Sequence, residues 1–168
     1  MSNNVEVQKF TISRTFNAPK SKVWQAFTEG ESLKIWWGPK GTMMEDVTLA
    51  FRVGGKFHYC LIQADGSEMW GLFVYQDIEP EDKIIFVNSF SNEEGEIADS
   101  PFPMAWPKEI YNIITFEEKD EKTTVTLTGG PINATDEEIT TYNNFHDNMR
   151  GGFGNTLDQL EEYLASQE

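Results

Sequence analysis

Few residues in this chain combine the types and the spacing that metal binding requires. His58 and Cys60 stand two positions apart, so both would lie on one face of a strand and offer two ligands to zinc or iron. A metal site needs a third and a fourth ligand, and His146 is the only other histidine. We therefore expect no metal site, and we interpret His58 as a partly exposed strand residue beside a small buried thiol.

Nucleophilic catalysis and phosphate binding lack their usual signatures as well. Cys60 has no neighbouring base within its strand except His58, and no Gly-x-Ser-x-Gly segment occurs. The glycine-rich run at 151–154 lies inside a helical pattern instead of following a strand, which argues against a phosphate-binding loop. We accordingly expect no cofactor.

Acid–base catalysis has two weak candidates, His146 and Tyr59. His146 stands one helical turn after Tyr142 and borders an apolar stripe, so its ring is placed to face an interior pocket beside Met149. There it would exchange protons near neutral pH. The alternative, which we favour, is a rim residue satisfied by water, because no neighbour in the sequence fixes its tautomer.

A more informative signal is a set of aromatic and polar residues that alternate along the expected strands. In Phe57-His58-Tyr59 and in Gly71-Leu72-Phe73, every second residue falls on the same face. An apolar wall with a few tyrosine and asparagine tips is typical of a small-molecule site. The alternative is that the same rings interlock with the C-terminal helix as ordinary core. The predicted ligand site consists of Phe27, Trp36, Phe57, Tyr59, Gly71, Phe73, Tyr75, Phe86, Asn88, Asn112, Ile114, Phe145, His146, Met149 and Phe153.

The rest of the sequence predicts the elements that position these residues. A first strand over Val5 to Phe16 is followed by two short helices, one ended by Gly30 and the other over Glu31 to Trp36. Alternating segments separated by short turns, such as Asp65-Gly66, then predict an antiparallel meander. Its strands are expected at 44–51, 56–63, 68–78, 83–90, 109–118 and 123–128.

One long helix is expected to close the fold. Thr135 to Glu138 form a capping-box sequence, and apolar residues then recur every three or four positions from Ile139 to Leu164. Gly151, Gly152 and Gly154 fall in the middle of this helix, where each costs about 1 kcal/mol relative to alanine. We expect them to mark a kink, a close backbone approach or cavity space.

The composition bounds the partners and the setting of the protein. The formal net charge is −15 and no basic stripe occurs, which predicts that the protein binds neither nucleic acid nor anionic membranes. The length fits a single domain over residues 1–168. A single cysteine, no signal-like N-terminus and no membrane-length apolar run lead us to expect a cytoplasmic protein. The oligomeric state, a weak homodimer included, stays open.

Several motifs occur in an order and at a spacing that resemble a known group. They are Asn17-Ala18-Pro19, the Asp65-Gly66 turn, and the segments 54–59, 78–80 and 152–160. Together, over Val7 to Ala165, they resemble the START-like (SRPBCC) superfamily, and within it the group named after the activator of the heat-shock-protein-90 ATPase. Relatives often carry an acidic residue at the position of Ala50, which puts in doubt any ion pair that they make there with Arg52.

The resemblance implies an α+β helix-grip fold, in which a curved antiparallel sheet of about seven strands wraps a long C-terminal helix and leaves a cavity. It implies binding or carriage of a hydrophobic or aromatic small molecule, since relatives carry lipids, sterols or polyketides in that cavity. Two alternatives stay open, namely an enzyme of the cyclase or dehydratase type and a chaperone-associated interaction domain. We favour a binding protein over an enzyme.

The segment from Ser91 to Pro107 fits none of the expected strands. It is rich in proline and carries Phe102 and Trp106. This composition is typical of a flap over the mouth of a cavity, and equally of a purely structural surface loop.

Overall fold

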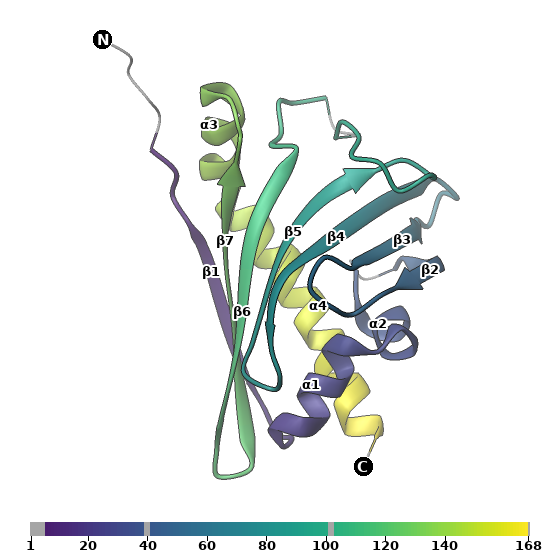
Figure 1. Cartoon of the computed structure of the whole chain (residues 1–168), viewed down its shortest axis with the longest axis vertical. Coiled ribbons are helices and arrows are strands. Elements are labelled where there is room, and N and C mark those ends of the chain that lie inside the picture. Colours follow the sequence, from purple (N-terminus) through teal and green to yellow (C-terminus); the bar gives the residue numbers. More distant parts are fainter. Residues whose placement is uncertain (1–5, 39–40, 101–102, 168) are drawn as a thin grey trace.

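The computed structural model describes residues 6–38, 41–100 and 103–167. Seven strands form one antiparallel sheet in the spatial order β1-β7-β6-β5-β4-β3-β2 (Figure 1). The strands are β1 (Phe10–Phe16), β2 (Met43–Leu49), β3 (Lys56–Ile62), β4 (Glu68–Glu79), β5 (Lys83–Ser91), β6 (Glu109–Lys119) and β7 (Lys122–Ile132). The helices are α1 (Lys20–Thr28), α2 (Gly30–Trp36), α3 (Asp136–Asn144) and α4 (His146–Ser166).

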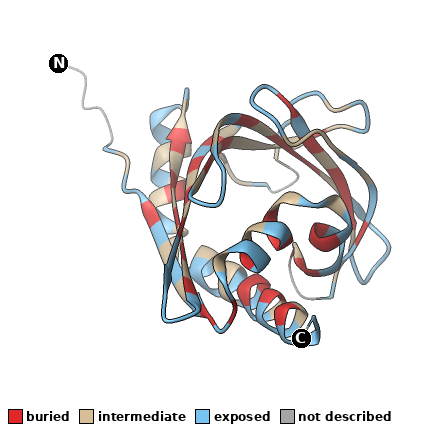
Figure 2. Ribbon diagram, turned by 60° about the horizontal axis from the view of Figure 1, so that its bottom comes forward, coloured by how far each residue is buried: buried red, intermediate tan, exposed pale blue. Residues whose placement is uncertain are grey.

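The sheet curves around the helices, and its buried residues lie on the inner side (Figure 2). Phe10, Phe57 and Leu160, which come from β1, β3 and α4, are each 1% exposed or less. Within the described residues, no helix is both long and apolar enough to span a membrane. The α+β helix-grip architecture predicted from the sequence, with two short helices after the first strand, is confirmed.

Two predicted boundaries were wrong. Strand β1 begins at Phe10, whereas the prediction began at Val5, which lies outside the described residues. The predicted single C-terminal helix is two helices, which meet at Phe145. The glycines at 151–154 do not interrupt the second of them, because α4 continues as helix from His146 to Ser166.

The break at Phe145 divides the apolar stripe between two helices, which bury different parts of the core. Helix α3 begins with the predicted capping box, in which Thr135 Oγ1 accepts from the Glu138 N–H and the Glu138 side chain accepts from the Thr135 N–H. It ends nine residues later, and Tyr142 on its inner side is completely buried. Helix α4 then takes a new direction across the concave face and buries Leu160 (Figure 1).

Helix α4 is tied to the connection that follows α2. Thr156 Oγ1 and Gln159 Nε2 both donate to the carbonyl of Gly38, at 3.0 and 2.7 Å. On the opposite flank, Arg14 of β1 forms an ion pair with Asp158. These contacts fix the position of α4 along the sheet, and therefore the space that remains beside its first two turns.

We expect the buried hydrogen bond of Thr123 to stabilise the fold. Thr123 Oγ1, at the start of β7, donates to the carbonyl of Ala18 at 2.8 Å, and the side chain is 0% exposed. In Thr123→Val the shape is kept but the carbonyl loses this donor, so the free energy of unfolding should fall by about 1–3 kcal/mol in urea titrations. Thr126→Val is the matched control on the same strand, because Thr126 makes no side-chain hydrogen bond among the described residues. Equal effects of the two substitutions would contradict the assignment.

Candidate functional site

Two adjacent hollows lie between the concave face of the sheet and the helices. The first lobe has a volume of about 180 Å³ and the second about 340 Å³. Because they share a wall, we describe them as one two-lobed cavity. The residues that line both lobes are Tyr59, Leu61, Met69, Phe90, Trp106, Met149 and Phe153.

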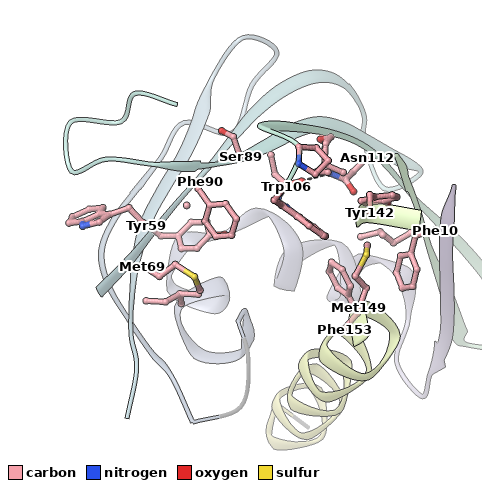
Figure 3. A pocket seen from close by; sticks show the side chains of 17 residues that line it. Phe10, Tyr59, Met69, Ser89, Phe90, Trp106, Asn112, Tyr142, Met149 and Phe153 are labelled. Atoms are coloured by element: carbon pink, nitrogen blue, oxygen red, sulfur yellow. Dashed lines mark hydrogen bonds between the residues drawn. The ribbon is translucent and has the colours of Figure 1, made fainter. Parts of the chain in front are cut away.

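The two lobes have different additional walls. The first lobe is completed mainly by the sheet, with Phe10, Trp70, Gly71, Asn88, Ser89, Ile110, Asn112 and Leu127, and by Pro107 and Tyr142 (Figure 3). The second lobe is completed by the connection after α2 and by one side of α4, with Trp37, Gly38, Phe145, Asn148, Gly152 and Thr156.

Trp106 stands at the boundary of the two lobes. Its indole ring lies between the group that contains Tyr59 and Phe90 and the group that contains Tyr142 and Met149 (Figure 3). The ring centroid is 5.8 Å from that of Tyr142 and 5.6 Å from that of Phe145. The segment 91–107 therefore supplies a wall of the cavity, while its movement as a flap stays a prediction and Phe102 lies outside the described residues.

Tyr59 reaches across Gly71, its direct partner on β4. A Cβ atom at position 71 would lie 2.4 Å from Tyr59 Cζ and 2.5 Å from the hydroxyl oxygen. Glycine thus makes room for the phenol ring over the floor of the sheet. Burial raises the pKa of Tyr59 to about 12, and a hydrogen bond from Trp37 acts in the opposite direction.

An asparagine pair forms the polar part of the first lobe. Asn112 Nδ2, on β6, donates to Asn88 Oδ1 on β5 at 2.6 Å and to the carbonyl of Ile110 at 3.1 Å. Asn112 faces Gly129 of β7, where a Cβ atom would lie 2.5 Å from Asn112 Oδ1. The Tyr142 hydroxyl donates to the Gly129 carbonyl at 3.0 Å. A second glycine in the sheet therefore accommodates a buried polar group.

The cavity has neutral walls. No charged side chain lines either lobe in the part of the chain that the structure describes. Burial raises the pKa of Tyr59 and of Tyr142 to about 12, so both phenols are protonated at neutral pH. The site consequently offers ring surfaces and hydrogen bonds, but no countercharge for an ionised molecule.

The structure divides the predicted site residues into three groups besides His146. Those that line the two-lobed cavity are Tyr59, Gly71, Asn88, Asn112, Phe145, Met149 and Phe153. Those that line a separate void of about 20 Å³, room for little more than one water molecule, are Phe27, Trp36 and Ile114. Those packed among one another as core are Phe57, Phe73, Tyr75 and Phe86, with Phe73 and Phe86 stacked at 4.2 Å.

His146 lies beside the cavity instead of on its wall. Its ring packs edge-on against Phe10 and Tyr142, with centroid distances of 5.6 and 5.3 Å. Its Nε2 atom is buried and has no hydrogen-bond partner among the described residues. Within the described part of the chain, no carboxylate or carbonyl is hydrogen-bonded to the imidazole, and His146 lines neither lobe.

His58 and Cys60 lie on the outer side of β3. His58 Nε2 donates to the carbonyl of Asn92 at 3.0 Å, and the imidazole stacks on Trp70 at 5.0 Å. Burial, followed by the nearby Glu68 carboxylate, raises the pKa of the Cys60 thiol to about 11. Within the described residues, no three potential ligands from His, Cys, Asp and Glu gather at one place. His58 instead anchors the start of the segment 91–107.

Both lobes include residues that the predicted site lacked, and those of the second lobe show why. Trp37 and Gly38 follow a short helix, where no periodicity marks which side chain points inward. Asn148 and Thr156 are polar residues of α4 that border its apolar stripe. One signal was present, since an unexplained glycine such as Gly152 in a helix interior indicated open space.

A curved antiparallel sheet that grips a C-terminal helix around a neutral, largely apolar cavity defines a START-like helix-grip domain. The model of the family described as Activator of Hsp90 ATPase homolog 1-like protein matches residues 17–165, and the chain belongs to this family. The resemblance stated from the sequence motifs is thereby confirmed.

Solved structures with the same fold come from several bacteria. A protein from Mycobacterium smegmatis is 22% identical, with 95% of each chain covered and a TM-score of 0.74. One from Staphylococcus epidermidis is 25% identical over 100% of this chain and 96% of that chain, also with a TM-score of 0.74. An AHSA1 protein from Silicibacter pomeroyi is 13% identical, covers 96% and 100%, and has a TM-score of 0.72. Among curated proteins, no significant match was found.

The buried phenol of Tyr59 predicts a loss of stability in alkali. Its folded-state pKa of about 12 exceeds the ordinary value of 10.0, so its contribution is complete below pH 10 and is lost as the pH rises toward 12. Tyr59→Phe should remove about 1 kcal/mol of the decrease in unfolding free energy between pH 9 and pH 11. Urea titrations of both proteins across this range measure the difference, and parallel curves would contradict it.

Proposed function

We propose that this protein binds a neutral, mainly apolar aromatic molecule in the two-lobed cavity. The observation that carries the proposal is the charge-free lining of both lobes, in which tryptophan, phenylalanine and methionine side chains predominate. Aromatic surfaces favour ring-shaped ligands through stacked and edge-on contacts. Transfer of an ionised group into such a site without a partner costs several kcal/mol, so charged compounds are selected against.

The size of the cavity supports a ligand rather than solvent alone. The second lobe, of about 340 Å³, lies within the range of about 300–1,000 Å³ that is usual for small-molecule sites. The first lobe adds depth beside it, because the two lobes share the side chains of Trp106, Met149 and Phe153. A molecule that fills both lobes would contact the sheet and α4 at once.

Binding is better supported than acid–base catalysis. The two sequence candidates for a catalytic proton donor or acceptor were His146 and Tyr59. His146 packs against Phe10 and Tyr142 outside the lining, and Tyr59 has a pKa far above neutrality. A general acid or base works best with a pKa near the operating pH, and neither residue supplies one to a molecule inside the cavity.

Two dyes that differ by one charged group test the proposal. N-phenyl-1-naphthylamine is neutral, and 8-anilino-1-naphthalenesulfonate has the same ring system with a sulfonate. We expect the neutral dye to bind with enhanced fluorescence, and the anionic dye to bind at least about tenfold more weakly, since its charge has no partner in the cavity. The titrations are made in low salt and again in 1 M NaCl, where the Debye length is about 3 Å.

The comparison between low and high salt separates the cost of burying the sulfonate in the cavity from its repulsion by the charged surface. The net charge of −15 repels the sulfonate at a distance, and this repulsion disappears in 1 M NaCl, whereas the cost of burying the sulfonate persists. Equal affinity for both dyes in high salt would contradict a neutral site. No binding of either dye would contradict the proposed function itself.

A pair of neighbouring glycines allows the cavity to be filled selectively. Gly152 lines the second lobe, whereas Gly151 lines neither lobe; both are exposed, and a Cβ atom at either position would meet nothing within 4 Å. Gly152→Leu should place a side chain in the second lobe and weaken binding of N-phenyl-1-naphthylamine by about tenfold or more. Gly151→Leu should leave the affinity unchanged, with thermal unfolding as the check that both variants are folded. Equal affinities of the two variants would show that the dye binds outside the second lobe.

A further inference from the structure

The wall of the first lobe carries hydrogen-bond donors without matching acceptors. Its lining includes the phenol and amide side chains of Tyr59, Asn88 and Asn112 on the sheet and of Tyr142 on α3. Because buried donors are normally paired, a donor that faces a cavity and has no protein acceptor indicates what a bound molecule must supply. The partners of each group can be followed one by one.

The orientation of the asparagine pair is determined by the backbone. The carbonyl of Ile110 can only accept, so the Asn112 atom 3.1 Å from it must be the amide nitrogen. The same nitrogen donates to Asn88 at 2.6 Å, which identifies the accepting atom as the Asn88 oxygen. The Asn88 amide nitrogen is thereby left with two N–H donors that have no acceptor among the described residues. The Asn112 oxygen lies against Gly129, in the space that a Cβ atom would occupy.

The two tyrosine hydroxyls of the lobe differ in whether their protons have an acceptor. The Tyr142 hydroxyl already donates to the Gly129 carbonyl at 3.0 Å. The Tyr59 hydroxyl lies over Gly71 and lines the lobe, and among the described residues its proton has no acceptor. Among the tyrosine and asparagine side chains of this lobe that the structure describes, the Tyr59 O–H and the Asn88 N–H groups are therefore the donors without an acceptor.

The two donors lie on the same face of the sheet and close to each other. The Tyr59 hydroxyl is above Gly71 of β4, and Gly71 pairs with Phe90 of β5, two residues after Asn88. Gly71 and Asn88 are thus diagonal neighbours, about 7–8 Å apart between backbones. Tyr59 and Phe90 lie together on one side of the Trp106 ring, and Asn112, which binds Asn88, lies on the other side (Figure 3).

We infer that the ligand is a neutral aromatic carbonyl compound whose oxygen atoms accept hydrogen bonds from Tyr59 and Asn88. This inference rests on the proposed function and names the chemistry that the first lobe selects. A carbonyl oxygen accepts through two lone pairs and brings no donor, which matches the unpaired donors of Tyr59 and Asn88. A carboxylate would also accept, but its charge has no partner among the lining residues.

A matched pair of competitors tests the inference. 2-Acetylnaphthalene and 2-ethylnaphthalene have nearly the same size, and only the ketone has an acceptor. Each is used to displace N-phenyl-1-naphthylamine from the wild-type protein, from Tyr59→Phe and from Asn88→Asp. The aspartate keeps an oxygen for the Asn112 N–H while it removes the donor.

The ketone should bind the wild-type protein about two- to tenfold more tightly than the hydrocarbon, as expected for one or two neutral hydrogen bonds. Tyr59→Phe and Asn88→Asp should each reduce this preference, and Tyr59→Phe should leave the affinity for the hydrocarbon unchanged. Tyr111→Phe is the control, because Tyr111 adjoins Asn112 on β6 but is exposed and lines neither lobe. It should keep the full preference for the ketone.

The possible failures are distinguishable. Equal displacement by ketone and hydrocarbon, with no change in either variant, would overturn the carbonyl inference and leave binding of neutral aromatic molecules intact. If the ketone is still preferred in both variants, its oxygen accepts hydrogen bonds from groups other than Tyr59 and Asn88, and the inference is overturned. Failure of both naphthalenes and of the dye to bind would overturn the proposed function together with the inference.

Discussion

A single helix about 10 Å across cannot cover the concave face of a seven-stranded sheet, which is about 30 Å wide. Helices α1 and α2 cover one end of that face together with α4, and the rings of Phe27 and Trp36 fill the contact there. At the other end α3, the segment 91–107 and the first turns of α4 contribute separate side chains, among them Tyr142, Trp106 and Met149. The cavity is the part of the concave face that these elements leave uncovered.

The break between α3 and α4 follows from the same geometry. A straight helix over 136–166 would be about 45 Å long, and its first turns and last turns would have to follow one direction. By ending at Asn144, α3 keeps Tyr142 above β7, where its hydroxyl reaches the carbonyl of Gly129. Helix α4 then crosses toward Gly38 and α2. The periodicity of the apolar stripe continues through the break, which is why the sequence pattern predicted one helix.

The sequence predicted which face of the sheet a side chain lies on, but not whether that side chain is packed core or lines the cavity. Strand alternation correctly placed Phe57 and Tyr59 on one face, but it cannot distinguish a ring that is covered by other rings from one that lines a cavity. Phe57 packs beneath its neighbours, while Tyr59 is raised into the lobe because its partner is Gly71. The contribution of Trp37 could not be predicted, since its side-chain direction depends on how the connection after α2 packs on α4.

Glycines on opposite walls set different properties of the cavity. Gly71 and Gly129 lie in strands, where glycine is unfavourable, yet each makes room for the end of a polar side chain, the Tyr59 hydroxyl or the Asn112 amide oxygen. They determine which hydrogen-bonding groups face the cavity. Gly152 lies on the helix, where a Cβ atom would meet only open space, so its absent side chain contributes volume. Because one wall controls the hydrogen bonds and the other controls the space, substitutions on the helix can change the size of the accepted molecule without changing its preferred functional group.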